Sequence, residues 1–160
     1  MLPSKSYLAA VRVGLVEYLK TATGIQWDYY GSIITPDEGA KGGVFVTTTR
    51  PPQGINYTRM THEVQLQLLL AHPDHQEAQG MLCDWGQYLI ETVRQLSRDG
   101  LSGTYRGVQL NVACCGIKIL DGIKYYVQDA DQRQDIPEGI ALGTLQLNCE
   151  FIYESSVQLV

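Results

Sequence analysis

Two of the three histidines stand close together and have the residue types of metal ligands. His72-Pro73-Asp74-His75 places two imidazoles and a carboxylate side by side. A helix presents two ligands to one ion when they lie three or four residues apart on continuous helix, and Pro73 interrupts a helix here. No Cys-x-x-Cys or His-Glu-x-x-His pair accompanies the cluster. We therefore interpret it as a loop that leads into a helix and expect no metal or cofactor site.

A hydrolytic triad could be assembled from Ser102, His75 and Asp99. Such a triad needs a serine beside a base that an acid orients, and many hydrolases present the serine on a Gly-x-Ser-x-Gly turn. The sequence contains neither that turn nor a glycine-lined oxyanion loop. We therefore expect no catalytic residues and no enzymatic activity.

Two acidic segments have the composition of cation- or phosphate-binding loops. Residues 129–135 resemble the start of a calcium loop, but the sixth position is Gln134 and the twelfth is Ile140, where glycine and glutamate are needed. Asp37 and Glu38 precede three nearby glycines without the Lys-Ser/Thr pair of a phosphate loop. We expect flexible acidic loops at about 35–43 and 129–139 that meet solvent or a partner.

The composition describes one globular domain over residues 1–160. Hydrophobic residues make up 44% and charged residues 18% of the 160 positions, which excludes a disordered tail. The net charge of -5 argues against a surface that binds many phosphates. The four cysteines are too few for a secreted disulfide framework. No apolar run is long enough to span a membrane, and Met1 to Lys20 lacks the features of a signal peptide, so we expect a cytoplasmic origin and no membrane partner.

Two helices are expected from apolar residues at helical spacing. A stripe from Leu8 to Leu19 predicts a helix over residues 6–21, which Gly24 ends. Asp74 with Glu77 resembles a capping box and predicts a second helix over 75–97. We expect Trp85 in the core, because it lies on the apolar stripe of that helix.

Strands are expected in the stretches of alternating or β-branched residues. These cover residues 44–49, 63–68, 108–114, 117–127 and 145–153, with a further short strand within 25–34. Asp121-Gly122 predicts a two-residue hairpin turn, and Gly116 a bulge. Tyr125 and Tyr126 point to opposite sides of their strand, so one of them is expected to face outward as an interface anchor.

The order of elements predicts an α+β fold, a mostly antiparallel sheet with two α-helices packed on one face. The other sheet face is then rich in amides and nearly uncharged, whereas strands that face solvent usually carry more charge. We interpret this face as a subunit interface. Its residues are Gln65, Gln67, Gln109, Asn111, Gln146 and Asn148.

Four features occur in order along the chain: an opening amphipathic helix (Tyr7–Lys20), a strand that ends in a Thr-Arg pair (Val44–Arg50), an alternating strand (Glu63–Leu70) that leads through an Asp-x-x-Glu-Ala link (Asp74–Ala78) into a long helix, and late strands that close the sheet. With these features the chain resembles the tail terminator proteins, also called tail completion or minor capsid proteins, of long-tailed bacteriophages.

The resemblance implies a small α+β fold and a homohexameric ring without a cofactor. Such a ring, assembled in the host cytoplasm, caps the tail tube in the virion, stops its polymerisation and receives the filled head. Its partners would be the tail tube protein and a neck or head-completion protein, and double-stranded DNA would pass through it without specific binding. We then expect five acidic residues on surfaces that face DNA or neighbouring subunits: Asp37, Glu38, Asp129, Asp131 and Asp135.

Two alternatives stay open at this point. Another neck, tail-tube or baseplate component would share the acidic balance and the amide-rich face. A small cytoplasmic ligand-binding or enzymatic domain would instead have a pocket between the helices and the sheet.

Overall fold

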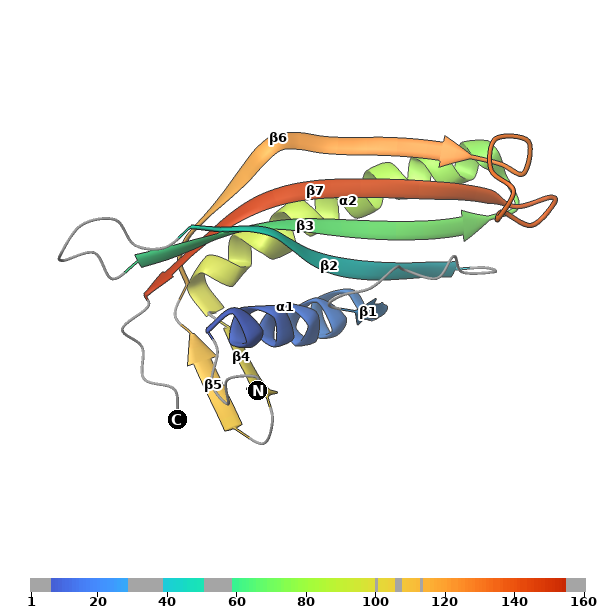
Figure 1. Cartoon of the computed structure of the whole chain (residues 1–160). Helices are drawn as coiled ribbons and strands as arrows, with labels where there is room; N and C mark the ends of the chain where they lie inside the picture. Colours follow the sequence, from blue (N-terminus) through green and yellow to red (C-terminus); the bar gives the residue numbers. More distant parts are fainter. Residues whose placement is uncertain are drawn as a thin grey trace.

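A five-stranded sheet with the order β1-β2-β3-β7-β6 forms the centre of the protein in a computed structural model (Figure 1). The structure describes residues 7–28, 39–50, 59–99, 101–105, 108–112 and 114–154. β1 runs parallel to β2, and the other pairs are antiparallel. The predicted α+β class with a mostly antiparallel sheet is confirmed. The strands of this sheet are β1 (Gln26–Asp28), β2 (Gly39–Arg50), β3 (Arg59–His72), β6 (Cys114–Gln128) and β7 (Ala141–Glu154).

Both predicted helices are present, as α1 (Tyr7–Thr23) and α2 (His75–Asp99). Gly24 follows α1 at a φ of 72°, and its N–H donates to the Lys20 carbonyl at 2.9 Å, as expected for a helix that glycine terminates. At the start of α2, Asp74 Oδ1 accepts from the backbone N–H groups of Gln76 and Glu77 at 2.9 and 3.0 Å. Local capping thus sets these two helix boundaries.

Both helices bury their apolar stripes against one face of the sheet, which we call the inner face. Figure 1 shows α2 running behind β3, β7 and β6, with α1 beside the β1–β2 side. One continuous cluster joins Leu15 and Leu19 of α1 to Leu82 and Leu89 of α2 and to the alternating strand residues. The strand members of this cluster include Val44, Val64, Leu66, Leu68, Leu145, Leu147, Cys149 and Phe151.

The predicted hairpin at Asp121-Gly122 is wrong. β6 continues through both residues. Leu120 pairs with Asn148 of β7, the next two residues are unpaired, and the pairing continues with Ile123 opposite Leu147. Asp121 and Gly122 have φ values of 56° and 72°, so the left-handed backbone that suits a tight turn here forms a bulge. β7 offers a continuous partner on both sides of the bulge, and this pairing replaces the local turn. A second register shift, between Cys114 and Gly116, matches the bulge predicted at Gly116.

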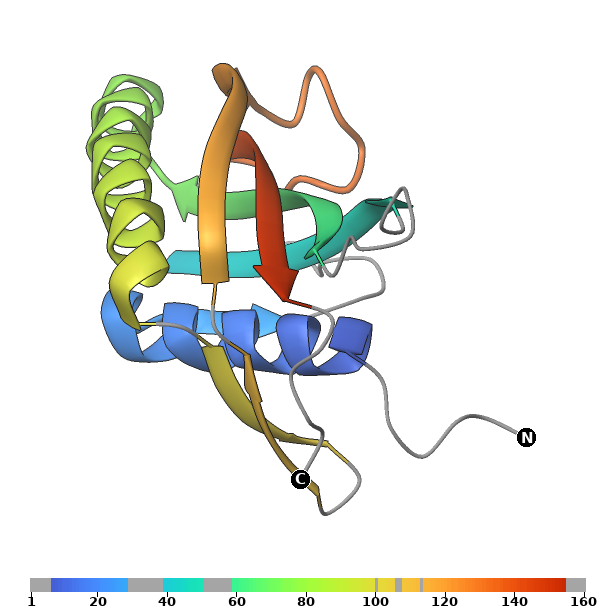
Figure 2. The same ribbon diagram turned by 90° about the vertical axis from the view of Figure 1, so that its left-hand side faces the viewer.

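Residues 108–112 do not join the main sheet, contrary to the sequence prediction. They form β5 (Val108–Val112), which pairs in a separate two-stranded sheet with β4 (Leu101–Tyr105). β4 contacts α1, and the small sheet projects below α1 in Figures 1 and 2. Pairing with a segment this near in the sequence requires little loop-closure entropy. The partner strand Leu101–Tyr105 was not predicted, because it contains a glycine, which is unfavourable in the interior of a strand.

The connection from β6 to β7 lies on the opposite side of the sheet from α2 (Figure 2). Its Ile136 is 3% exposed and packs with Leu69 and Leu142, which point away from the inner face. This contact fixes the connection to one end of the sheet face opposite the helices, which we call the outer face.

Candidate functional site

Four of the predicted amides lie together at the centre of the outer face, on β3 and β7. Gln65 stands directly opposite Asn148, and Gln67 directly opposite Gln146. Gln65 Nε2 donates to Asn148 Oδ1 at 3.3 Å. All four side chains are half-buried, and no helix packs over them within the described ranges. We call Gln65, Gln67, Gln146 and Asn148 the amide patch.

The other two predicted members of this surface lie elsewhere. Gln109 and Asn111 belong to β5, in the separate two-stranded sheet. Strand alternation predicts which residues of one strand share a side, but it carries no information about which strands are neighbours. The six amides therefore do not share one sheet face.

Charged side chains border the amide patch, so the face is less neutral than the sequence suggested. A guanidinium nitrogen of Arg50 donates to Glu63 at 2.6 Å and to Glu150 at 2.7 Å, which ties β2 to β3 and β7. Lys118 stands opposite Glu150 on the neighbouring strand. The sequence places Arg50 at the end of a strand but does not show its partners, because only the strand register brings it beside the two carboxylates.

The acidic residues of the β6–β7 connection partly organise that connection itself. Asp129 Oδ1 accepts from the Asp131 N–H at 3.2 Å, and Asp135 accepts from Arg133 Nε at 2.7 Å. Asp131 and Asp135 are exposed, whereas Asp129 is half-buried. The other predicted acidic residues, Asp37 and Glu38, lie outside the described residues, and the end of the flexible loop predicted at 35–43 is wrong, because residues 39–43 belong to β2 and pair with β3.

The histidine cluster has a structural role at the start of α2. His72 Nδ1 accepts from the Asp74 N–H at 2.9 Å, and its Nε2 lies 3.4 Å from Glu77. Across the described ranges, no group of three or more His, Cys, Asp or Glu side chains is arranged to hold a metal ion. His75 and Asp99 stand at opposite ends of α2, about 36 Å apart at the usual helical rise, so they cannot serve one triad.

His62 lies on the inner face, in the same row of β3 as Val64 and Leu66. It is 0% exposed, and its Nδ1 is hydrogen-bonded to Thr49 Oγ1 at 2.8 Å. Burial lowers the pKa of His62 from 6.5 to about 4, because the protein interior disfavours the charged imidazolium. The residue is therefore neutral in the folded protein at pH 7.

No family model matches the chain. No curated protein matches it significantly either.

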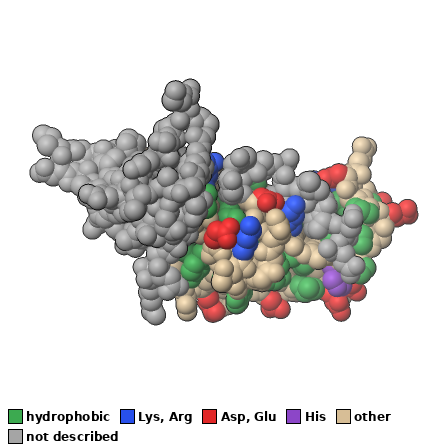
Figure 3. All heavy atoms as spheres, turned by 90° about the horizontal axis from the view of Figure 1, so that it is seen from below, with side chains coloured by type: hydrophobic (Ala, Val, Ile, Leu, Met, Phe, Trp, Pro, Cys, Tyr) green, Lys and Arg blue, Asp and Glu red, His purple; other side chains and the backbone are tan. Residues whose placement is uncertain are grey.

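The described helices include none that is long and apolar enough to cross a membrane. On the face shown in Figure 3, acidic and basic side chains are interspersed with neutral ones over the described surface.

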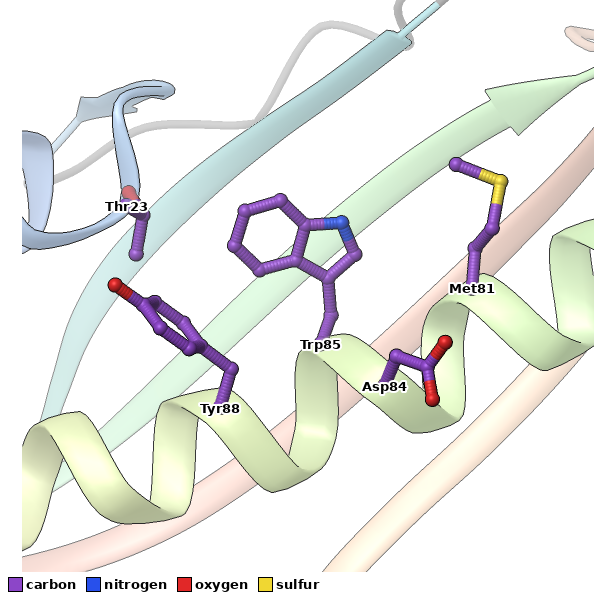
Figure 4. Close-up of a pocket in the computed structure, with 5 residues that line it drawn as sticks. All are labelled: Thr23, Met81, Asp84, Trp85 and Tyr88. Carbon is purple, nitrogen blue, oxygen red and sulfur yellow. The ribbon is translucent and has the colours of Figure 1, made fainter.

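A pocket of about 410 Å³ lies between the end of α1 and the first half of α2 (Figure 4). Thr23, Met81, Asp84, Trp85 and Tyr88 line it. The Tyr88 hydroxyl donates to the carbonyl of Ala22 at 2.5 Å, which closes one side of the pocket against α1.

The sequence predicted Trp85 in the core, but in the structure it lies only partly there. It is half-buried: it packs against the main core cluster and also faces the pocket. Met81, Trp85 and Tyr88 are spaced four and three residues apart, so the sequence could have shown that they share one side of the helix. The opposing wall from α1 was not visible in the sequence.

Tyr125 and Tyr126 are both exposed, at 40% and 49%, on β6 at the edge of the sheet. Tyr125 contacts α2 on the inner side, whereas Tyr126 belongs to the outer row with Thr144. Their opposite directions agree with the sequence prediction.

Proposed function

We propose that this protein is a ring-forming virion component at the head–tail junction of a long-tailed bacteriophage, with a tail-terminator-like fold. In this role a homohexamer caps the tail tube, stops its polymerisation and provides the interface for head joining. The observation that carries the proposal is the amide patch, a neutral polar surface at the centre of a sheet face that no described helix covers. The sequence resemblance to tail terminators supplies the ring and its partners.

The chemistry of the amide patch suits contact with another protein. Each amide has donors and an acceptor, so it can hydrogen-bond a neighbouring subunit without the desolvation cost of burying a charge. The Arg50 ion pairs beside the patch resemble the polar rim that surrounds most interfaces. A ring requires two different surfaces per subunit, since each contact in it is heterologous.

The charge of the chain suits a channel through which DNA moves. A lumen with many lysines and arginines would bind phosphates and release counterions, and this would slow the DNA. The net charge of -5 and the exposed Asp131 and Asp135 disfavour such binding. We propose that the β6–β7 connection faces either the lumen or a neighbouring ring component.

Two other functions remain candidates on specific observations. A different neck, tail-tube or baseplate component would use the same amide patch at another position in the particle. A small cytoplasmic ligand-binding or enzymatic domain is favoured by the pocket between α1 and α2, because binding sites are usually apolar concavities with a few polar groups.

The test is the mass of the purified protein by light scattering over a concentration series, alone and with tail tube protein. A discrete species of six subunits is expected. Gln67→Lys with Gln146→Lys should abolish it by placing like charges at the contact, whereas Gln79→Lys, on the exposed side of α2, should leave it intact. A monomer under all conditions would refute the ring and favour the ligand-binding alternative.

A further inference from the structure

Two aromatic rings form a corner in the pocket between α1 and α2. The ring centroids of Trp85 and Tyr88 are 5.8 Å apart, and their planes meet at 85°. The hydrogen bond from Tyr88 to Ala22 holds the phenol ring in place. Figure 4 shows the indole standing between Tyr88 and Met81, pointing away from the helix axis into the space beside α1. Aromatic faces carry negative charge density, so such a corner attracts cations.

The pocket also has an uncompensated negative charge. Asp84 precedes Trp85, and its carboxylate is exposed, with no hydrogen bond or ion pair among the described residues. α1 ends at Thr23 on the rim, so the negative end of its dipole lies at the same place.

A second hollow, also lined by aromatic side chains and a carboxylate, continues the pocket along the groove between the helices. It has a volume of about 220 Å³ and lies on the other side of Tyr88, which lines both spaces. Glu91 is among its lining residues. Neither hollow has a lysine or arginine among its described lining residues. The groove therefore combines aromatic and apolar surface with carboxylates.

We propose that the pocket binds an arginine side chain presented by a partner protein. The guanidinium stacks on the face of Trp85 and pairs with the Asp84 carboxylate, while its methylene stem contacts Met81. Arginine fits better than lysine because its planar, weakly hydrated cation stacks on indole and pairs with a carboxylate through two N–H groups. This inference does not depend on the proposed ring, since the pocket lies on the helical side of the sheet and the amide patch on the other.

The probe is N-acetyl-arginine methyl ester, which carries the guanidinium without other charges. The chain has two tryptophans, so its NMR spectrum contains two indole N–H signals, and the Trp85→Phe variant assigns them. We expect the Trp85 signal to shift saturably, with a dissociation constant in the millimolar range, as suits a single side chain. The Trp27 signal should shift much less, because Trp27 is 0% exposed and reaches the pocket only through the hydrogen bond from its Nε1 to Thr23 Oγ1.

Two comparisons make the experiment decisive. N-acetyl-citrulline methyl ester has nearly the same shape without the charge and should bind at least about 5-fold more weakly. Asp84→Asn should weaken arginine binding by about 3-fold, whereas Asp131→Asn, an exposed carboxylate of the β6–β7 connection, should not change it. Equal shifts with arginine and citrulline, or equal binding by Asp84→Asn, would overturn the proposal.

A dilution series without ligand distinguishes a partner protein from a second copy of this chain. The Trp85 signal should not depend on protein concentration. A concentration-dependent shift that Asp84→Asn removes would show that the occupant comes from another copy, and the proposed partner would then be wrong. Failure of the ring, by contrast, would appear only in the light-scattering experiment.

Discussion

The indole ring of Trp27 lies over the α-carbon of Gly42 on the neighbouring strand, in the space that any other side chain at position 42 would occupy. Trp27 is 0% exposed and belongs to the main core cluster. Its Nε1 donates to Thr23 Oγ1 at 2.9 Å, so the ring is held from α1 as well. A residue without a side chain at position 42 thus lets the short strand β1 close the sheet.

Gly42→Ala should therefore destabilise the protein. The added methyl group would overlap the six-membered part of the Trp27 indole, which is buried and cannot move into solvent. Overpacking of this kind costs about 1–3 kcal/mol of unfolding free energy. Urea denaturation measures it. In a double-mutant cycle, Trp27→Leu should reduce the cost of Gly42→Ala, and strictly additive effects would contradict the contact.

The same substitution should have a different effect in α2. At Gly86 a methyl group would overlap the hydroxyl oxygen of Tyr125 and would lie 3.0 Å from its Cε1 and Cζ atoms. Tyr125 is 40% exposed and can swing outward, while alanine gains about 1 kcal/mol of helix propensity over glycine. We expect Gly86→Ala to change the unfolding free energy by less than about 1 kcal/mol.

Gly80 supplies the matched control for that comparison. It lies in the same helix, and among the described residues no atom beyond its chain neighbours and the helix's own backbone stands within 4 Å of an added methyl group. Gly80→Ala should raise the unfolding free energy by about 0.5–1 kcal/mol. If Gly86→Ala stabilised the protein as much as Gly80→Ala, Tyr125 would not be in contact with α2.

Cys149 should resist alkylation in the folded protein. It is 0% exposed on β7, and burial raises the pKa of its thiol to about 12, so almost no thiolate forms. Cys83, by contrast, is exposed on α2. Under iodoacetamide at about pH 8, where an ordinary thiol is partly ionised, peptide mass spectrometry should detect modified Cys83 long before modified Cys149. Equal rates in native buffer would contradict the core position of β7, and denaturation in concentrated urea should make the rates similar.

The two helices were predictable because their determinants are local. Asp74 stands at the cap position and Gly24 at the terminating position, and each acts on backbone groups a few residues away. The inner-face strand residues were predictable for a similar reason, since alternation along β3 and β7 requires only that one sheet face is buried.

Pairing between distant segments was not predictable from the same patterns. Asp121 and Gly122 prefer a left-handed backbone, which occurs both in a tight hairpin turn and in a bulge. The bulge forms because β7 is long enough to pair with β6 on both sides of these residues. Gln109 and Asn111 lie in a strand that belongs to another sheet. The pocket was not predictable because one of its walls comes from the end of α1, and the residue spacing within α2 does not show which element packs beside Trp85.

His62 should make the stability depend on pH below neutrality. Its pKa is about 4 in the folded protein and 6.5 in the unfolded chain, so between these values the unfolded chain binds a proton that the folded chain does not. The contribution of His62 to stability is therefore complete above pH 6.5 and falls as the pH is lowered toward 4. Over that window the loss attributable to His62 is about 3 kcal/mol, from the energy of one pKa unit.

His62→Gln isolates this contribution, because it keeps a polar group near Thr49 Oγ1 but has no proton to gain. Carboxylates also titrate in part of this range, so the quantity to measure is the difference in slope between the two proteins. Urea denaturation at closely spaced pH values should show a flatter dependence for the variant as the pH falls from 6.5 toward 4, and parallel curves at higher pH. Equal slopes throughout would mean that His62 becomes protonated within the folded protein, and its position on the inner face would then need another explanation.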